Sequence, residues 1–309
     1  MSAPDRSQAL TQAPFEGGGT RSESAASAAA GVDRYAVIGH PVAHSRSPFI
    51  HGAYARATGQ AMAYARLDCP IDGFEAVLRA FARSGARGCN VTLPFKFDTP
   101  RLAARCTARA LLAGAANTLR FDADGWLADN TDRIGLVRDI ERNAGVGLAA
   151  RRLLLIGAGG GAAGALGALL AAGPRELVVA NRSVDKARVL VARHAGVAQR
   201  AGVALCAAPL DDCGEAFDIV VNATASSLHG AASPVPPRVL APGALAIDMM
   251  YGPAAAPFLA WAAAHGAVAR DGLGMLVEQA AQAFALWRGV VPDTAPVLAA
   301  LRERWDETA

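Results

Sequence analysis

The chain has 309 residues, of which 52% are hydrophobic and 18% are charged, and its formal net charge is +3 at pH 7. This length favours two domains, and the composition is that of a globular protein, which excludes a wholly disordered chain. The small net charge gives no reason to expect nucleic acid or a membrane surface as a partner.

The N-terminal segment and the cysteines bear on where the protein works. The first 32 residues are rich in Ser, Ala and Gly and lack the continuous apolar core of a secretory signal, so we expect a disordered extension. No apolar stretch reaches membrane-spanning length without a charge or a glycine cluster. The five cysteines are scattered without a C-x-x-C pair, which disfavours disulfides and a metal site and favours a cytoplasmic location.

Strands and helices alternate in the first ordered part of the chain. Strands are predicted at residues 34–39, 63–68 and 88–93. Helices are predicted at residues 47–59 and 72–85, and two short ones over about 98–112. Ser47 is expected to be the N-cap of the first helix, before Pro48 at its first position. Residues 116–132 are predicted to form a hairpin with its turn at Asp124-Gly125. This alternation predicts an α/β fold with a mainly parallel sheet.

A second block of strands follows a predicted helix at about 133–144. Apolar, β-rich runs predict strands at residues 152–157, 176–181, 202–207, 217–224 and 244–249. Their near-continuous hydrophobicity is typical of parallel strands that are buried on both faces. The last forty residues, from about Gly272, predict two helices.

A glycine-rich turn joins the first of these strands to an alanine-rich helix. Gly157, Gly159 and Ala162 fit the pattern G-x-G-x-x-G/A, in which the first glycine makes the turn and the second lets a pyrophosphate approach the backbone. The helix N-terminus beyond supplies free N–H groups for the phosphates. The predicted dinucleotide site therefore comprises Gly157, Ala158, Gly159, Gly160, Gly161 and Ala162.

The end of the next strand predicts which dinucleotide binds. An NAD enzyme usually has Asp or Glu there, whereas this strand ends in Asn181-Arg182-Ser183. Arg182 can pair with a 2′-phosphate, and Lys186 adds charge one helical turn later. This pattern favours NADP(H) as the cofactor, the alternative being two cations that only solvate a helix face.

Several motifs in order resemble the shikimate dehydrogenase family, from about Arg34 to Arg304. The matching segments are VIGHPVAHSRSP, NVTLPFK, GAANTL, DNTD, GAGGGAAG, NRS, VNAT, DMMY and DGLGMLVEQAA. The resemblance implies reversible, NADPH-dependent reduction of 3-dehydroshikimate to shikimate, a step towards chorismate and the aromatic amino acids. It also implies two α/β domains with a cleft between them. The substrate-binding and catalytic domain would be 33–132 plus about 272–309, and the Rossmann-type NADP-binding domain 133–271.

The resemblance implies a catalytic lysine at Lys96 and a partner aspartate at Asp129. A ketone that accepts hydride develops negative charge on its oxygen, which a nearby ammonium stabilises and can protonate. Pro94 is expected to end the preceding strand and turn Lys96 towards the cleft. Asp129 is expected to hold the lysine in place.

The resemblance also assigns residues to the substrate and the nicotinamide. Ser45 and Ser47 match a pair that binds the substrate carboxylate, and both hydroxyls can donate hydrogen bonds. The other matches on the substrate side are Thr92, Asn117 and Gln279, for the hydroxyls, and Tyr251, for a further contact. The matches that line the nicotinamide pocket are Thr224, Met249 and Gly272, with ordinary core packing an equal alternative for Met249.

Two residues depart from the family pattern, Arg133 where a glycine is common after DNTD and Ala225 where a serine is common after NAT. The sequence admits two other functions. A quinate/shikimate dehydrogenase that uses NAD is disfavoured by the missing strand-end carboxylate and weakly by Ser47. A catalytically silent NADP-binding sensor would not need Lys96 and the substrate residues together. The expected partner is the small-molecule substrate, with the protein a monomer or homodimer.

Overall fold

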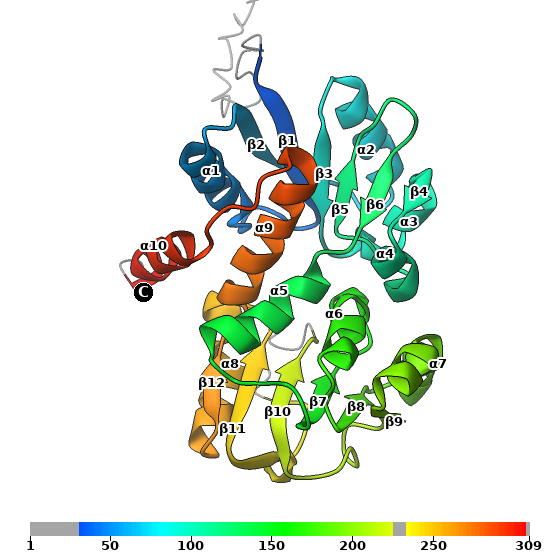
Figure 1. The fold of residues 1–309 in the computed structure, drawn as a ribbon, viewed down its shortest axis with the longest axis vertical. Coiled ribbons are helices and arrows are strands. Elements are labelled where there is room, and N and C mark those ends of the chain that lie inside the picture. Colours follow the sequence, from blue (N-terminus) through cyan, green and yellow to red (C-terminus); the bar gives the residue numbers. More distant parts are fainter. Residues whose placement is uncertain (1–30, 225–232, 307–309) are drawn as a thin grey trace, which may run out of the picture. The chain divides into compact units, whose positions relative to one another are not determined.

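The computed structural model describes residues 31–224 and 233–306, and it has an α/β fold with two six-stranded sheets (Figure 1). The predicted fold class is therefore confirmed. The predicted extension lies almost wholly outside the described residues, and so does Ala225. No helix in the described ranges is long and apolar enough to cross a membrane.

The first sheet has the strand order β2-β1-β3-β5-β6-β4. Its strands are β1 (Asp33–Gly39), β2 (Met62–Asp68), β3 (Gly88–Val91), β4 (Arg105–Cys106), β5 (Thr118–Arg120) and β6 (Leu127–Asp129). β1 pairs in parallel with β2 and β3, whereas β5 is antiparallel to β3 and β6. The predicted hairpin is thus confirmed. β4 lies inside a segment predicted to be helical.

Short helices connect the strands of this sheet. They are α1 (Ser47–Thr58), α2 (Phe74–Arg83), the 3-10 helix η1 (Phe95–Phe97), α3 (Thr99–Leu102) and α4 (Ala108–Ala113). The prediction that Ser47 caps α1 is wrong. Arg46 holds the N-cap position in helical geometry, and no side chain caps the helix. Ser47 is instead the first helical residue, so its hydroxyl is not used by the cap.

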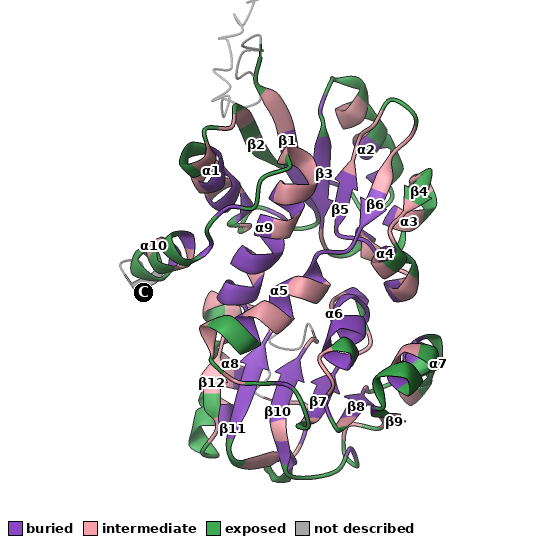
Figure 2. Ribbon diagram, viewed as in Figure 1, coloured by how far each residue is buried: buried purple, intermediate pink, exposed green. Residues whose placement is uncertain are grey.

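The second sheet is parallel throughout, with the order β12-β11-β10-β7-β8-β9. Its strands are β7 (Arg152–Ile156), β8 (Glu176–Ala180), β9 (Ala204–Ala208), β10 (Phe217–Asn222), β11 (Leu240–Asp248) and β12 (Val268–Arg270). The five predicted strands are confirmed and β12 is additional. Successive residues of β7 point into two different cores: Leu153 packs on one face of the sheet and Leu154 on the other. The strand is therefore buried on both faces (Figure 2).

Helices of this half connect parallel strands, as the topology requires. They are α6 (Gly160–Ala171), α7 (Val184–Ala201) and α8 (Ala256–Ala264), with 3-10 turns η4 (Pro237–Val239) and η5 (Gly252–Ala254). α6 directly follows the glycine-rich turn, and α7 follows the Asn-Arg-Ser segment. Both cofactor motifs therefore lie at the carboxyl ends of neighbouring parallel strands, where such sheets bind ligands.

Four further helical segments complete the fold. They are α5 (Asp132–Arg138), the π-helix η2 (Asp139–Asn143), α9 (Leu273–Arg288) and α10 (Ala295–Asp306). α5 packs against both α9 and α6. The residues at the start of α5 therefore lie close to the glycine-rich turn and to the helix that carries Gln279.

Candidate active site

Lys96 forms an ion pair with Asp132, not with Asp129. The lysine lies on η1, five residues beyond Val91 at the end of β3, and its Nζ is 2.6 Å from Asp132 Oδ2. The two side chains are only 14% and 6% exposed. The prediction that Asp129 holds the lysine is wrong, because the second aspartate of the D-N-T-D segment makes this contact.

Asp129 has a different set of partners. It is fully buried and accepts hydrogen bonds from the hydroxyl of Thr107, the guanidinium of Arg109 and the backbone N–H of Asn130. Burial alone would raise the pKa of its carboxyl, but the bonds from Arg109 and Thr107 outweigh burial and lower it. Asp129 is thus a buried anion that is already satisfied by α4 and its N-cap.

Asn117 connects the lysine–aspartate pair to α9. Its Nδ2 donates to Asp132 Oδ1 at 2.9 Å and to Gln279 Oε1 at 3.2 Å. Gln279 Oε1 also accepts from Thr131 Oγ1 at 3.1 Å. These side chains are buried, so their polar atoms depend on one another for hydrogen bonds. Two predicted substrate residues, Asn117 and Gln279, therefore belong to one network with Asp132. Thr131 was not predicted, although it lies within DNTD.

The two predicted carboxylate-binding serines lie together. Ser45 Oγ donates to Ser47 Oγ at 3.2 Å, and the backbone N–H of Ser47 donates to Ser45 Oγ at 3.3 Å. Tyr251, which follows β11, reaches the same loop through the backbone of Arg46. Burial raises the pKa of the Tyr251 hydroxyl, partly offset by that backbone contact and by the charges of Arg46 and Arg66.

Thr92 lies beside the start of the serine loop. It directly follows β3, and its backbone N–H donates to Ile38 O at 2.9 Å. A Cβ on Gly39 would lie 2.3 Å from Thr92 Cγ2, so the two backbone segments approach more closely than any residue but glycine allows. The threonine hydroxyl has no hydrogen-bond partner among the described residues, and its side chain is partly exposed. It is therefore available to a ligand.

The glycine-rich turn lies next to Lys96. Gly157 has φ +110°, a conformation that only glycine adopts without strain. A Cβ on Gly160, the first residue of α6, would lie 3.2 Å from Lys96 Cβ. A Cβ on Gly159 would meet no atom within 4 Å. The turn is thus open at Gly159, where a pyrophosphate could approach, and close to Lys96 at Gly160.

The three predicted nicotinamide residues also border this turn. A Cβ on Gly157 would lie 3.1 Å from Thr224 Cγ2, and one on Gly161 would lie 3.2 Å from Met249 Cε. Gly272 is packed against the backbone of Met249, because a Cβ there would lie 2.4 Å from its carbonyl oxygen. Thr224 and Met249 are therefore brought together at the glycine-rich turn, and Gly272 packs behind Met249.

The cations after β8 are free to meet a phosphate. Arg182 and Lys186 are exposed, and neither forms an ion pair with a described residue. Asn181 Nδ2 donates to Ser183 O at 2.9 Å and shapes the turn into α7. The nearest acid, Asp185, pairs with Arg188 at 2.8 Å, so its carboxylate is neutralised by that arginine and not by Arg182 or Lys186. The residues present fit a dinucleotide that carries a 2′-phosphate. In the described ranges, no three His, Cys, Asp or Glu side chains are placed to hold a metal ion.

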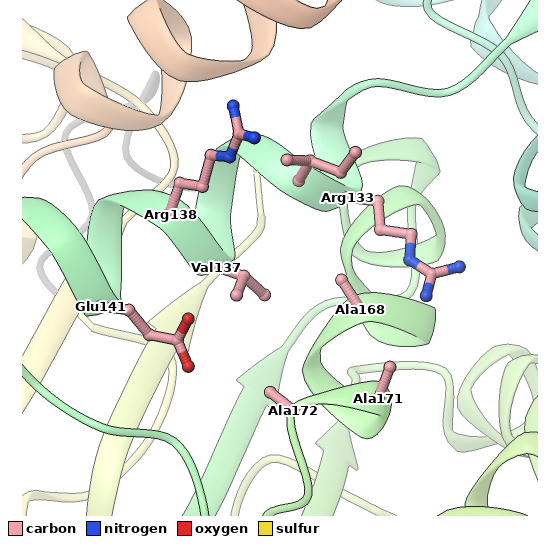
Figure 3. A pocket seen from close by; sticks show the side chains of 8 residues that line it. Arg133, Val137, Arg138, Glu141, Ala168, Ala171 and Ala172 are labelled. Atoms are coloured by element: carbon pink, nitrogen blue, oxygen red, sulfur yellow. The ribbon is translucent and has the colours of Figure 1, made fainter.

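The Arg133 side chain forms no ion pair with Asp132, which directly precedes it and pairs with Lys96. It lines a pocket of about 350 Å³ between α5, η2 and the end of α6, together with Ile134, Val137, Arg138, Glu141, Ala168, Ala171 and Ala172. In Figure 3 the Arg133 and Arg138 side chains point in different directions, and only that of Arg138 points away from the labelled alanines. Burial, and then the charge of Arg109, lower the pKa of Arg133. Lys96 and Asp132 are not among the lining residues, so this pocket is separate from the candidate active site.

Comparisons with known proteins agree with this geometry. Three family descriptions match: "Shikimate dehydrogenase substrate binding domain" at residues 37–119, "Shikimate / quinate 5-dehydrogenase" at 139–231, and "Shikimate 5'-dehydrogenase C-terminal domain" at 272–302. The "Shikimate dehydrogenase (NADP(+))" of Methylibium petroleiphilum is 66% identical over 280 residues, which cover 89% of this chain and 95% of that relative.

Solved structures show the same fold. An Ael1 enzyme from Pseudomonas putida is 47% identical with a TM-score of 0.79, covering 87% of this chain and 98% of that one. Shikimate 5-dehydrogenase from Thermus thermophilus, solved with NADP(H) and shikimate, is 32% identical with a TM-score of 0.77, covering 88% and 99%. These likenesses extend over nearly all of the described residues. The chain therefore belongs to the shikimate dehydrogenase family.

Proposed function

We infer that the protein is an NADP-dependent shikimate dehydrogenase, which interconverts 3-dehydroshikimate and shikimate in the route to chorismate and the aromatic amino acids. The observation that carries this inference is the buried Lys96–Asp132 pair beside the glycine-rich turn, where a Cβ on Gly160 would lie 3.2 Å from Lys96 Cβ. A proton donor and a dinucleotide site are thus adjacent. Family membership supplies the substrate.

The residues around Lys96 suit ketone reduction. Bound NADPH supplies a hydride to the carbonyl carbon. Lys96 Nζ stabilises the negative charge that grows on the carbonyl oxygen and gives it a proton, so that one hydride and one proton convert the ketone to an alcohol. Asp132 Oδ2 holds the ammonium, while Asn117 holds the other carboxylate oxygen. This arrangement fixes the proton donor before the substrate arrives.

Six polar residues are proposed to bind the substrate. Ser45 and Ser47 donate to its carboxylate, close to the N-terminus of α1. The remaining contacts are assigned to Thr92, Asn117, Gln279 and Tyr251. Asn117 and Gln279 are already hydrogen-bonded to each other in a buried network. A substrate hydroxyl that binds there has to join this network, so only a hydroxyl in the right position is accepted.

The cofactor is proposed to bind along the carboxyl ends of β7 and β8. The backbone of Gly157, Ala158, Gly159, Gly160, Gly161 and Ala162 takes the pyrophosphate. Asn181, Arg182, Ser183 and Lys186 take the 2′-phosphate side, and Thr224, Met249 and Gly272 take the nicotinamide side. Arg182 and Lys186 form no ion pair with any described residue, and their charge favours NADP over NAD.

We also propose that residues 33–132 and about 272–309 form the substrate domain and 133–271 the NADP domain. The protein would work in the cytoplasm as a monomer or homodimer, with shikimate and 3-dehydroshikimate as its small-molecule partners.

The decisive experiment follows NADPH consumption with 3-dehydroshikimate, using NADH in parallel. We expect fast turnover with NADPH, little with NADH, and a loss of about a hundredfold or more in Lys96→Ala. A folded wild type that binds NADPH but shows no turnover would favour a silent NADP-binding sensor. Equal rates with NADH would favour the NAD-using quinate/shikimate reading.

A further inference from the structure

One face of the edge strand β2 holds the loop that carries Ser45 and Ser47. β2 pairs in parallel with β1, so that Asp68 lies opposite Gly39, where the loop leaves β1. Residues at alternate positions of a strand point to the same face. Tyr64, Arg66 and Asp68 are such a set, and each of them contacts the loop.

The outer two residues of this set fix the two ends of the loop. Asp68 Oδ1 accepts from the backbone N–H of Val42 at 3.3 Å, and Asp68 Oδ2 lies 3.2 Å from His40 Nδ1. At the other end, the Tyr64 hydroxyl interacts with the Ser47 side chain and donates to Asn90 Oδ1 at 2.6 Å. The loop is therefore tied at both ends to one strand.

Arg66 holds the middle of the loop, at Ser45 itself. Its Nε and Nη2 both donate to the carbonyl oxygen of Ser45, at 2.8 and 2.6 Å. Two bonds from one planar guanidinium restrict the orientation of this peptide more than a single bond would. The positive charge also reaches the neighbouring Tyr251, whose hydroxyl responds to both Arg66 and Arg46.

We propose that Arg66 is a positioning residue for the substrate carboxylate: it aims the Ser45 hydroxyl and places a positive charge behind the two serines. This inference rests on the proposed function, because it takes Ser45 and Ser47 as the carboxylate-binding pair. The substrate carboxylate would then contact the two neutral serine hydroxyls directly, with the Arg66 guanidinium bound to the backbone on the other side of Ser45. Specificity for a carboxylate over a neutral group arises from that cation.

The test compares Arg66→Gln with Arg66→Lys, using shikimate and its neutral methyl ester. In Arg66→Gln we expect KM for shikimate to rise about tenfold, as for a lost charge-assisted hydrogen bond, with kcat and KM for NADP within about twofold. KM for the ester should rise by less than about threefold, because the ester carries no charge. Arg66→Lys, which keeps the charge, should recover most of the discrimination between the two substrates.

Salt provides an independent readout. The wild-type KM for shikimate should rise between about 0.01 and 0.5 M salt, and this dependence should flatten in Arg66→Gln but persist in Arg66→Lys. The matched control is Arg87→Gln, which removes an exposed arginine that pairs with Asp33 at the opposite end of the same sheet. It should leave both KM values and the salt dependence unchanged.

Three results would overturn the proposal: an unchanged KM for shikimate in Arg66→Gln, an equal rise for shikimate and the ester, or a change confined to kcat. Calorimetric binding of shikimate to the same variants gives the answer without turnover. If the wild type binds shikimate but does not oxidise it, the proposed activity fails, and the binding constants still decide the role of Arg66. A wild type that binds no shikimate would overturn both.

Discussion

Lys96 Nζ and Asp132 Oδ2 are 2.6 Å apart, and the same carboxylate accepts a second bond from Asn117 on its other oxygen. Asp132 is the first residue of α5, while Lys96 lies on a 3-10 turn after β3. The pair thus joins two segments that are far apart in sequence. Three residues earlier, Asp129 ends β6 and pairs with Arg109 instead. Two aspartates of one short motif therefore have separate tasks.

This separation predicts opposite outcomes for two identical substitutions. Asp132→Asn should lower kcat by about a hundredfold or more, because it loosens the proton donor. Asp129→Asn should lower the free energy of unfolding by about 3 kcal/mol, because it leaves Arg109 facing a neutral group in a buried site. Steady-state kinetics and urea unfolding of both variants test this. A larger loss of kcat in Asp129→Asn than in Asp132→Asn would contradict the assignment.

The cofactor preference depends on the cations after β8. Arg182→Ala should raise KM for NADP about tenfold or more, because one charge-assisted contact to the 2′-phosphate is lost, and should leave KM for NAD unchanged. Arg188→Ala is the control, since Arg188 is an exposed cation on α7, the helix that follows Arg182, and it pairs with Asp185. Equal effects of both substitutions would mean that only the overall positive charge in this region matters.

The fold and most of the site could be predicted because they depend on contiguous patterns. The strands of the second sheet are long apolar runs, and the glycine-rich turn lies within one segment. β4 and β12 escaped prediction because two or three residues carry no measurable periodicity. Asp129 and Asp132 could not be told apart, since only the path from β6 into α5 decides which carboxylate faces Lys96. Ser47 suggested a cap because Pro48 follows it, but the helix begins one residue earlier than a cap would require.

Gly272 should tolerate no side chain. A Cβ there would lie 2.4 Å from the carbonyl oxygen of Met249, and backbone cannot move aside cheaply. Gly272→Ala should therefore cost about 1–3 kcal/mol of stability and raise KM for NADP, since Met249 borders the glycine-rich turn. Gly147→Ala is the control, because a Cβ at Gly147 meets no atom within 4 Å. Thermal unfolding with and without NADP measures both effects, and an unchanged melting temperature in Gly272→Ala would contradict the packing seen here.

The free energy of unfolding should fall as the pH drops below about 6.5, because the protein contains a buried histidine that stays neutral when folded. His51 is fully buried and stacks on Tyr64 with ring centroids 4.3 Å apart, and burial lowers its pKa to about 3. Above about pH 6.5 this histidine is neutral in both the folded and the unfolded protein, so it does not oppose folding. Between about pH 6.5 and 3 only the unfolded chain takes up the proton, which stabilises the unfolded state and lowers the free energy of unfolding. The slope from one such group approaches about 1.4 kcal/mol per pH unit.

Urea unfolding of wild type and His51→Gln from pH 7.5 down to 4.5 would measure this slope. We expect the slope to decrease in His51→Gln by about the contribution of one proton, whatever the substitution does to stability at neutral pH. His194, which is also buried with a lowered pKa, keeps part of the dependence. Asp129, with its lowered carboxyl pKa, contributes only at more acidic pH. His265→Gln is the control because His265 is exposed. If His51→Gln and wild type show the same slope, His51 does not stay neutral in the folded protein, and the stack against Tyr64 must accommodate a charged ring.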